Sequence, residues 1–239
     1  GAPAPTMKSL DQVEARTIVN ATNTPGDASN QFIISQPGSY YLAGNITGVA
    51  SKNGIRINVS GVTLDLNGFA MHGIGPSFAG IFCASGTVRV AIVNGTISGW
   101  PLDGIDAGLS INGRFEKLTV SGNGNSASRA GIRTGQAAVV RDCVAYGGTG
   151  HAFRSGDACV FNSCSAYLNT GSGFALSNND VVTDCVAQGN GVHGFDGAHA
   201  CVLTNCTAAS NASNGYNFSG DGCAFDRCAA RLNSGIGIN

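Results

Sequence analysis

Apolar residues recur at fixed intervals along the second half of the chain, and the interval is 21 residues, stretched once to 22. Two columns hold large apolar side chains, at Ile132, Phe153, Phe174, Phe195 and Tyr216 and at Val140, Phe161, Val182, Leu203 and Phe225. A third column places a cysteine two residues before an alanine, at Cys143, Cys164, Cys185, Cys206 and Cys228. Because residues i and i+2 of a strand share one face, each repeat is predicted to contain three short strands separated by turns.

A repeat of this kind cannot bury its apolar face alone. Stacking one coil on the next buries a continuous core and pairs every strand in parallel with its neighbours. A helical repeat is excluded because no segment keeps apolar residues at a 3.6-residue spacing. The sequence therefore predicts an all-β chain, a right-handed parallel β-helix of about eight three-strand coils from Asn53 onward. Its right hand follows from the general preference of parallel crossovers.

The two ends of the chain depart from the repeat. Residues 1–38 are predicted to form an N-terminal cap and lead-in, with "SLDQVEARTIV" as a short helix that Ser9 caps, and residues 39–239 to form the β-helix. The final "GIN" aligns with the "GYN" that begins at Gly215, so the last coil is incomplete. An exposed coil leaves backbone groups unpaired, and self-association through it is therefore one expected interaction.

Composition narrows the class of partner. The chain has 13 basic and 14 acidic residues, a net charge of -1 and no Lys/Arg cluster, which argues against nucleic-acid binding. No apolar run approaches the length that a membrane span needs. Only 11% of residues are charged and 36 are glycine, a balance that favours short strands and tight turns over surface helices.

The cysteine column and the asparagine column contain residue types that often form binding sites, but both are interpreted as structural. Closely spaced cysteines can indicate zinc or a disulfide framework, but here one position is repeated once per coil. Parallel neighbours in a ladder hold their Cβ atoms too far apart for a favoured disulfide, so we expect buried free thiols that react only after denaturation. The turn column is expected to form a ladder of stacked amides, and its members are Gly148, Asn169, Asn190, Asn211 and Asn233.

The segment "PGSYYLAGNITG", followed by "GVTLDLNGFAMHG" and "VAIVNGTISGW", resembles the pectin-lyase-like superfamily of right-handed parallel β-helix proteins. The resemblance covers roughly Gly38 to Asn239. The quoted segments are also similar to those of many bacterial β-helix proteins that are commonly exported, which implies a secreted or cell-surface protein. The superfamily includes polysaccharide lyases, polygalacturonases, uronate epimerases, phage tailspikes and adhesins. The Asp pairs of the polygalacturonase motif and the Arg motif of pectate lyases are not found at matching positions, so no catalytic residue is carried over.

A neighbouring column is expected to face solvent and to carry the chemistry. It places Asp106, Arg133 and Arg154 on adjacent coils, about 5 Å apart. A carboxylate beside two guanidinium groups could bind a uronate and move a proton, with arginine holding the acid group in a bidentate manner. The alternative is that these are solvated charges that balance one another.

Other candidates are weaker. Trp100, in the loop "SGWPLDG", could stack on a sugar ring or be a packed loop residue. Asp196 is flanked by His193 and His199, a trio with acid/base potential, and Asp196 and His193 could also contact substrate. No metal site or cofactor is expected, because the histidines lack zinc spacing and a ladder would make Cys159, Asp180 and Cys201 collinear.

Two classes of function fit these observations. In the first, the protein interacts with glycans or is structural, without an evident catalytic motif. In the second, it is a polysaccharide lyase, a glycoside hydrolase or a uronate epimerase that acts on an extended polysaccharide along the outer strand face. Polysaccharide is a possible partner in both, although a purely structural protein would need none.

Overall fold

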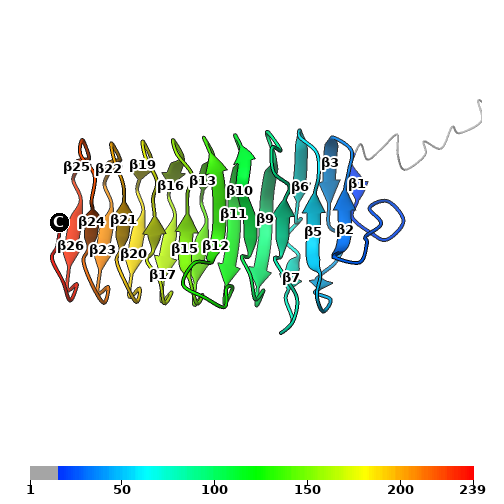
Figure 1. Ribbon diagram of the computed structural model, residues 1–239, viewed down its shortest axis with the longest axis horizontal. Helices are drawn as coiled ribbons and strands as arrows, with labels where there is room; N and C mark the ends of the chain where they lie inside the picture. The colour runs from blue at the N-terminus through cyan, green and yellow to red at the C-terminus, as the bar shows by residue number, and fades with distance from the viewer. Residues whose placement is uncertain (1–15) are drawn as a thin grey trace, which may run out of the picture.

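The computed structural model describes residues 16–239, and they form a straight rod of stacked coils that runs from β1 to β26 (Figure 1). All pairings between named strands are parallel, and no helix occurs in residues 16–239. The predicted parallel β-helix is confirmed. The described residues contain no helix long and apolar enough to cross a membrane.

Each coil has three faces. The first face contains one strand per coil, namely β2 (Asn30–Ile34), β5 (Asn53–Ile57), β8 (Ile81–Cys83), β10 (Ile105–Ile111), β12 (Ala130–Gln136), β15 (His151–Arg154), β18 (Phe174–Ala175), β21 (Phe195–Gly197) and β24 (Tyr216–Phe218). Eight of these nine strands begin at or after Asn53, as predicted, and β2 adds a coil before them.

The second and third faces join in two long strands, β9 (Ala91–Ser98) and β11 (Arg114–Ser121), which span both. The other strands of the second face are β1 (Thr17–Ile18), β3 (Gly38–Tyr41), β6 (Val62–Asp65), β13 (Val139–Arg141), β16 (Val160–Asn162), β19 (Val181–Thr183), β22 (Val202–Thr204) and β25 (Ala224–Asp226). Those of the third face are β4 (Ile46–Thr47), β7 (Ala70–His72), β14 (Val144–Tyr146), β17 (Ser165–Tyr167), β20 (Val186–Gln188), β23 (Thr207–Ala209) and β26 (Ala229–Arg231).

The core is built from vertical stacks of identical or similar side chains. Phe153, Phe174, Phe195 and Tyr216 are in register on the first face and fully buried, and their ring centroids lie 4.8 to 5.0 Å apart. This spacing is the ordinary distance between paired strands. The 21-residue period therefore works because it returns each apolar side chain to a position directly above its predecessor.

Left-handed residues bend the chain at three corners in each coil from β8 onward. In one coil they are Ala158, Ser163 and Leu168, with φ of 60°, 54° and 55°. Asp, Asn and Gly tolerate this conformation best, and they occupy many of the equivalent positions. The corner between the second and third faces contains Asn67, Asn94, Lys117, Asp142, Ser163, Asp184, Asn205 and Arg227.

The asparagine column forms the predicted ladder. Asn190 Nδ2 donates to Asn211 Oδ1 at 3.0 Å, and Asn169 Nδ2 donates to Asn190 Oδ1 at the same distance. All nine cysteines are free, and seven of them are buried. The thiols bond to backbone carbonyls of their own coil and of the preceding coil, as Cys164 Sγ does with Asn162 and Val140.

The N-terminal end differs from expectation. Strands β1 and β2 lie inside the segment that we expected to be a lead-in, yet β1 pairs in parallel with β3, and β2 pairs in parallel with β5. Parallel pairing therefore begins at Thr17. Most of the expected helix, including Ser9, lies outside the described residues, but Thr17 and Ile18 at its end are strand. At the other end, Ile238 forms a parallel bridge with Tyr216, as the alignment of "GIN" predicts.

Candidate functional site

The structure brings the three candidate catalytic residues onto adjacent strands of the first face. Asp106 is in register with Arg133, and Arg133 is in register with Arg154. The column continues through Ala175 to Asp196. All five side chains are half-buried on the outside of the rod, while their strand neighbours point into the core. We call this outward column the polar track.

Asp106 and Arg133 contact each other loosely. The distance from Asp106 Oδ1 to Arg133 Nη1 is 3.8 Å, and the same carboxylate oxygen accepts the backbone N–H of Gly108 at 3.2 Å. A Cβ at Gly108 would lie 2.6 Å from Arg133 Nε, so this glycine lets the guanidinium lie against the strand. With 34% of its side chain exposed, Arg133 keeps donors available to a ligand.

Arg154 is held by a loop between β11 and β12. Its Nη1 donates to the carbonyl of Ser128 at 2.9 Å. The neighbouring Arg129 anchors the loop through Asp103, with Nη1 and Oδ2 3.2 Å apart. Burial raises the pKa of Asp103, although Arg129 and the N–H of Ala130 favour its ionised form. Arg154 is therefore bound to a neutral carbonyl, whereas Arg129 is committed to an ion pair.

A hollow of about 270 Å³ opens in the polar track between Arg154 and Asp196. Ala175 is the column member between them, and its small side chain leaves this space. The lining places a cation at one end, a carboxylate at the other and two hydroxyl groups between, and it consists of Arg154, Ser155, Ala175, Leu176, Ser177, Asp196, Gly197 and Ala198. A ligand here would meet donors and acceptors on a mainly polar floor.

Asp180 lies near this hollow and is fully buried. It accepts the Ser155 hydroxyl at 2.5 Å, the N–H of Cys159 at 2.7 Å and the N–H of Ser177 at 2.9 Å. Burial raises its pKa to about 6 against these bonds, which favour the ionised form. Three donors of the protein thus occupy its two oxygens, and two of these donors belong to Ser155 and Ser177, which line the hollow.

The His193, Asp196 and His199 trio does not form one cluster. Nδ1 of His193 accepts the N–H of Asn214 at 3.2 Å, and Nδ1 of His199 accepts a backbone N–H of the next coil at 3.1 Å. Asp196 Oδ1 accepts the side-chain amide of Asn217 at 2.8 Å. In the described part of the chain, no hydrogen bond joins the three residues. Only Asp196 lines the hollow.

Trp100 corrects one prediction. Its side chain is 0% exposed, so neither face of the ring is open to a sugar. The indole N–H donates to the carbonyl of Met71 at 3.2 Å, and the ring fills space beside Gly54 and Gly80, where a Cβ would lie 2.8 and 3.1 Å from it. The loop turns inward because these glycines make room, and the packed-residue alternative is the correct one.

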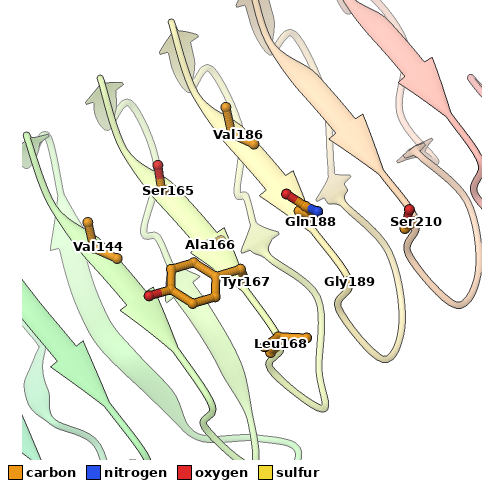
Figure 2. A pocket seen from close by; sticks show the side chains of 9 residues that line it. All are labelled: Val144, Ser165, Ala166, Tyr167, Leu168, Val186, Gln188, Gly189 and Ser210. Carbon is orange, nitrogen blue, oxygen red and sulfur yellow. The ribbon is translucent and has the colours of Figure 1, made fainter.

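Sequence reasoning missed a larger groove on the third face. It has a volume of about 650 Å³ and is lined by Val144, Ser165, Ala166, Tyr167, Leu168, Val186, Gln188, Gly189 and Ser210 (Figure 2). Two signals in the sequence point to it: two successive tyrosines in one column, and a leucine at a corner that is usually glycine.

Solved structures share this fold at low sequence identity. Pectate lyase Pel9A has a TM-score of 0.63 at 17% identity, over 77% of this chain and 57% of that one. The A-module of mannuronan C-5 epimerase AlgE4 from Azotobacter vinelandii has a TM-score of 0.67 at 18% identity, over 84% and 65%. The enzymatically active domain of tailspike protein 2 from bacteriophage CBA120 has a TM-score of 0.63 at 15% identity, over 92% and 42%. The chain thus spans less than two thirds of each.

A search of curated protein sequences finds no match. The family model described as "Right handed beta helix region" matches residues 79–238, which is more than half of the chain. The matched region includes every coil from β8 onward, and the structural neighbours share the parallel β-helix fold that the resemblance implies. The chain belongs to the right-handed β-helix family.

Proposed function

We propose that the protein binds an acidic polysaccharide along the polar track of the first face. The observation that carries this proposal is the column itself, which aligns Arg133 and Arg154 on adjacent coils beside the hollow at Ala175. Two structural neighbours are named for pectate and mannuronan, polymers whose sugars carry carboxylates. A guanidinium binds a carboxylate through two parallel N–H donors, which gives this face its selectivity.

The ladder geometry suits an extended polymer. Strands of successive coils lie about 4.8 Å apart, close to the length of one sugar residue in an extended chain. A polymer that follows the rod axis would therefore meet one outward side chain per sugar. Arg154 would exchange the carbonyl of Ser128 for a sugar carboxylate, and Arg133 would do so from a loose ion pair.

Binding without turnover fits the acids of this face better than catalysis does. A catalytic carboxyl must reach the reacting atom with a free oxygen. Asp106 is beside Arg133 and accepts the N–H of Gly108, and both oxygens of the buried Asp180 are occupied. Asp196 lines the hollow, but its Oδ1 accepts the side-chain amide of Asn217. The cations of the track are therefore better placed to recognise an acidic sugar than its carboxyls are to act on one. An export route to the cell surface or outside the cell would give the protein access to such polymers.

Calorimetric titration with trigalacturonate, trimannuronate and neutral cellotriose tests the proposal. The acidic oligomers should bind, more weakly as salt is added, and the neutral one should not bind this face. Arg133→Gln with Arg154→Gln should weaken binding by about tenfold or more, because each lost charged hydrogen bond is worth about 1.5–3 kcal/mol. Arg141→Gln, an exposed arginine on the second face, is the matched control and should change nothing.

Two results would contradict the proposal: absence of binding to either acidic oligomer, or binding that the double variant leaves unchanged. The same samples should be monitored for unsaturated products and new reducing ends. Steady turnover that the double variant abolishes would replace binding with the lyase, hydrolase or epimerase alternative.

A further inference from the structure

The groove on the third face lies between an outward column of side chains and the column of corner residues, and the type of residue changes in both columns at the groove. Tyr146, Tyr167 and Gln188 are successive members of one outward column. The two tyrosine rings stack with centroids 4.8 Å apart and an interplanar angle of 2°. Because the next member is Gln188, the aromatic stack ends at Tyr167, which lines the groove (Figure 2). One side of the Tyr167 ring thus has no aromatic neighbour from the column.

Leu168, the corner residue beside Tyr167, has a backbone conformation and an exposure to water that are both unfavourable for leucine. Its φ is 55°, a left-handed value that costs a bulky residue free energy, and 66% of it is exposed to water. The same corner is glycine at Gly99, Gly122, Gly147 and Gly189, and Ser210 and Leu232 follow in the last coils. The core does not need Leu168, so a strained and exposed leucine at the rim of a groove indicates a contact outside the fold.

The lining excludes a charged ligand. None of its nine residues is Asp, Glu, Lys, Arg or His, and its larger apolar side chains are Tyr167, Leu168, Val144 and Val186. The polar groups are the Gln188 amide and the hydroxyls of Ser165, Tyr167 and Ser210. A volume of about 650 Å³ lies within the ordinary range of ligand sites. The ligand should be neutral, with an apolar face and groups that hydrogen-bond.

We propose that this groove binds an N-acetylated hexosamine residue of a glycan, with the pyranose ring against Tyr167 and the acetamide near Leu168 and Gln188. The apolar face of a sugar ring packs on an aromatic ring, as other flat apolar groups do. The acetamide has one donor, one acceptor and a methyl group. Gln188 offers the complementary acceptor and donor, and Leu168 offers an apolar surface for the methyl. This site differs from the polar track in face, charge and ligand, so either proposal can fail alone.

The test uses the whole chain and triacetylchitotriose, followed by calorimetry and by NMR of the tyrosine resonances. Triacetylchitotriose should bind and shift the Tyr167 signals, and Tyr167→Ala should weaken binding by about tenfold. Tyr146→Ala is the matched control, because Tyr146 is the other ring of the stack but does not line the groove, and its effect should stay within about twofold. Arg133→Gln with Arg154→Gln should leave this binding intact.

Leu168→Gly separates a binding role from a structural one. Glycine relieves the left-handed strain and removes exposed apolar surface, so the melting temperature should stay the same or rise while binding weakens by about threefold. This variant also carries the test if Tyr167→Ala does not fold. No binding of triacetylchitotriose, or binding that Tyr167→Ala and Leu168→Gly both leave unchanged, overturns the site. Equal affinity for cellotriose overturns the acetamide assignment, and concentration-dependent dimerisation that buries Tyr167 overturns the glycan in favour of a second copy.

Discussion

The asparagine ladder allows a stability prediction that can be worked out bond by bond. Asn190 is 1% exposed, and its side chain makes four hydrogen bonds. Its Nδ2 donates to Ala166 O at 3.1 Å and to Asn211 Oδ1 at 3.0 Å. Its Oδ1 accepts Asn169 N at 3.2 Å and Asn169 Nδ2 at 3.0 Å. Asn190→Ala removes all four.

Not all of the partners are left unpaired. Asn169 Nδ2 keeps the carbonyls of Ala145 and Tyr167, and Asn211 Oδ1 keeps the backbone N–H of residue 190. One buried group loses its partner, the N–H of Asn169, whereas the carbonyl of Ala166 stays in the parallel ladder between β17 and β20. An unsatisfied buried group costs about 1–3 kcal/mol, so the free energy of unfolding should fall by about that amount. A water that enters the vacated space would bring the loss toward the lower value.

Urea denaturation followed by circular dichroism measures this loss, with hydrogen exchange of the Asn169 amide as a local probe. Asn233→Ala is the matched variant at the end of the ladder, where the side chain is only half-buried and water reaches the freed groups; its loss should be less than half as large. Asn125→Ala, on an exposed loop, should have no effect. A loss below about 1 kcal/mol for Asn190→Ala, or an equal loss for Asn233→Ala, would refute the reasoning.

Three further predictions concern the buried groups. Nine thiols should titrate in the unfolded chain without reductant, and in the native chain only the half-buried Cys223 and Cys228 should react at an appreciable rate; fewer than nine would mean that disulfides form. Burial raises the pKa of Asp180 to about 6, so between pH 4 and pH 6 the folded state binds the proton that the unfolded state has lost. The free energy of unfolding should fall by about 3 kcal/mol as pH rises through this window, and Asp180→Asn should abolish that part of the dependence; an unchanged profile would contradict the assignment. Trp100→Ala should cost about 3–5 kcal/mol, and the fluorescence of native Trp100 should not respond to any glycan; a response would show that the ring is accessible.

The sequence predicts most of the stacked fold because the evidence for it is repeated. Phe153, Phe174 and Phe195 occupy the same position in three successive repeats, and the structure stacks them as expected. Strand β2 escaped notice because it lacks the Gly-Ile pair that marks β5, β8 and β10: Phe32 is in register with Ile55, but Gln31 precedes it. Its pairing with β5 spans 23 residues, and a parallel ladder tolerates such changes of spacing when the extra residues lie in a corner.

The sites were harder to predict because each depends on a break in the repeat. The polar track follows from the register, but the hollow exists because Ala175 is small where its neighbours are long. The groove beside Tyr167 exists because Gln188 interrupts an aromatic column. Trp100 belongs to no column, so only three-dimensional packing against distant glycines could decide its burial. The repeat predicts the positions of residues that recur in every coil, but it does not predict the surroundings of a residue that departs from its column.

The corners have a consequence for protein engineering. The loop at residues 124–129 lengthens one corner by several residues, yet Ile105, Ile132 and Phe153 stay in register across it. Because each coil is fixed by its own strands and ladders, extra chain at a corner extends outward and leaves the stack undisturbed. A foreign peptide grafted at the corresponding corner beside Gly147 or Gly189 would be displayed at a known height along the rod. Grafts at several corners would form a regular array, with spacings that are multiples of one coil.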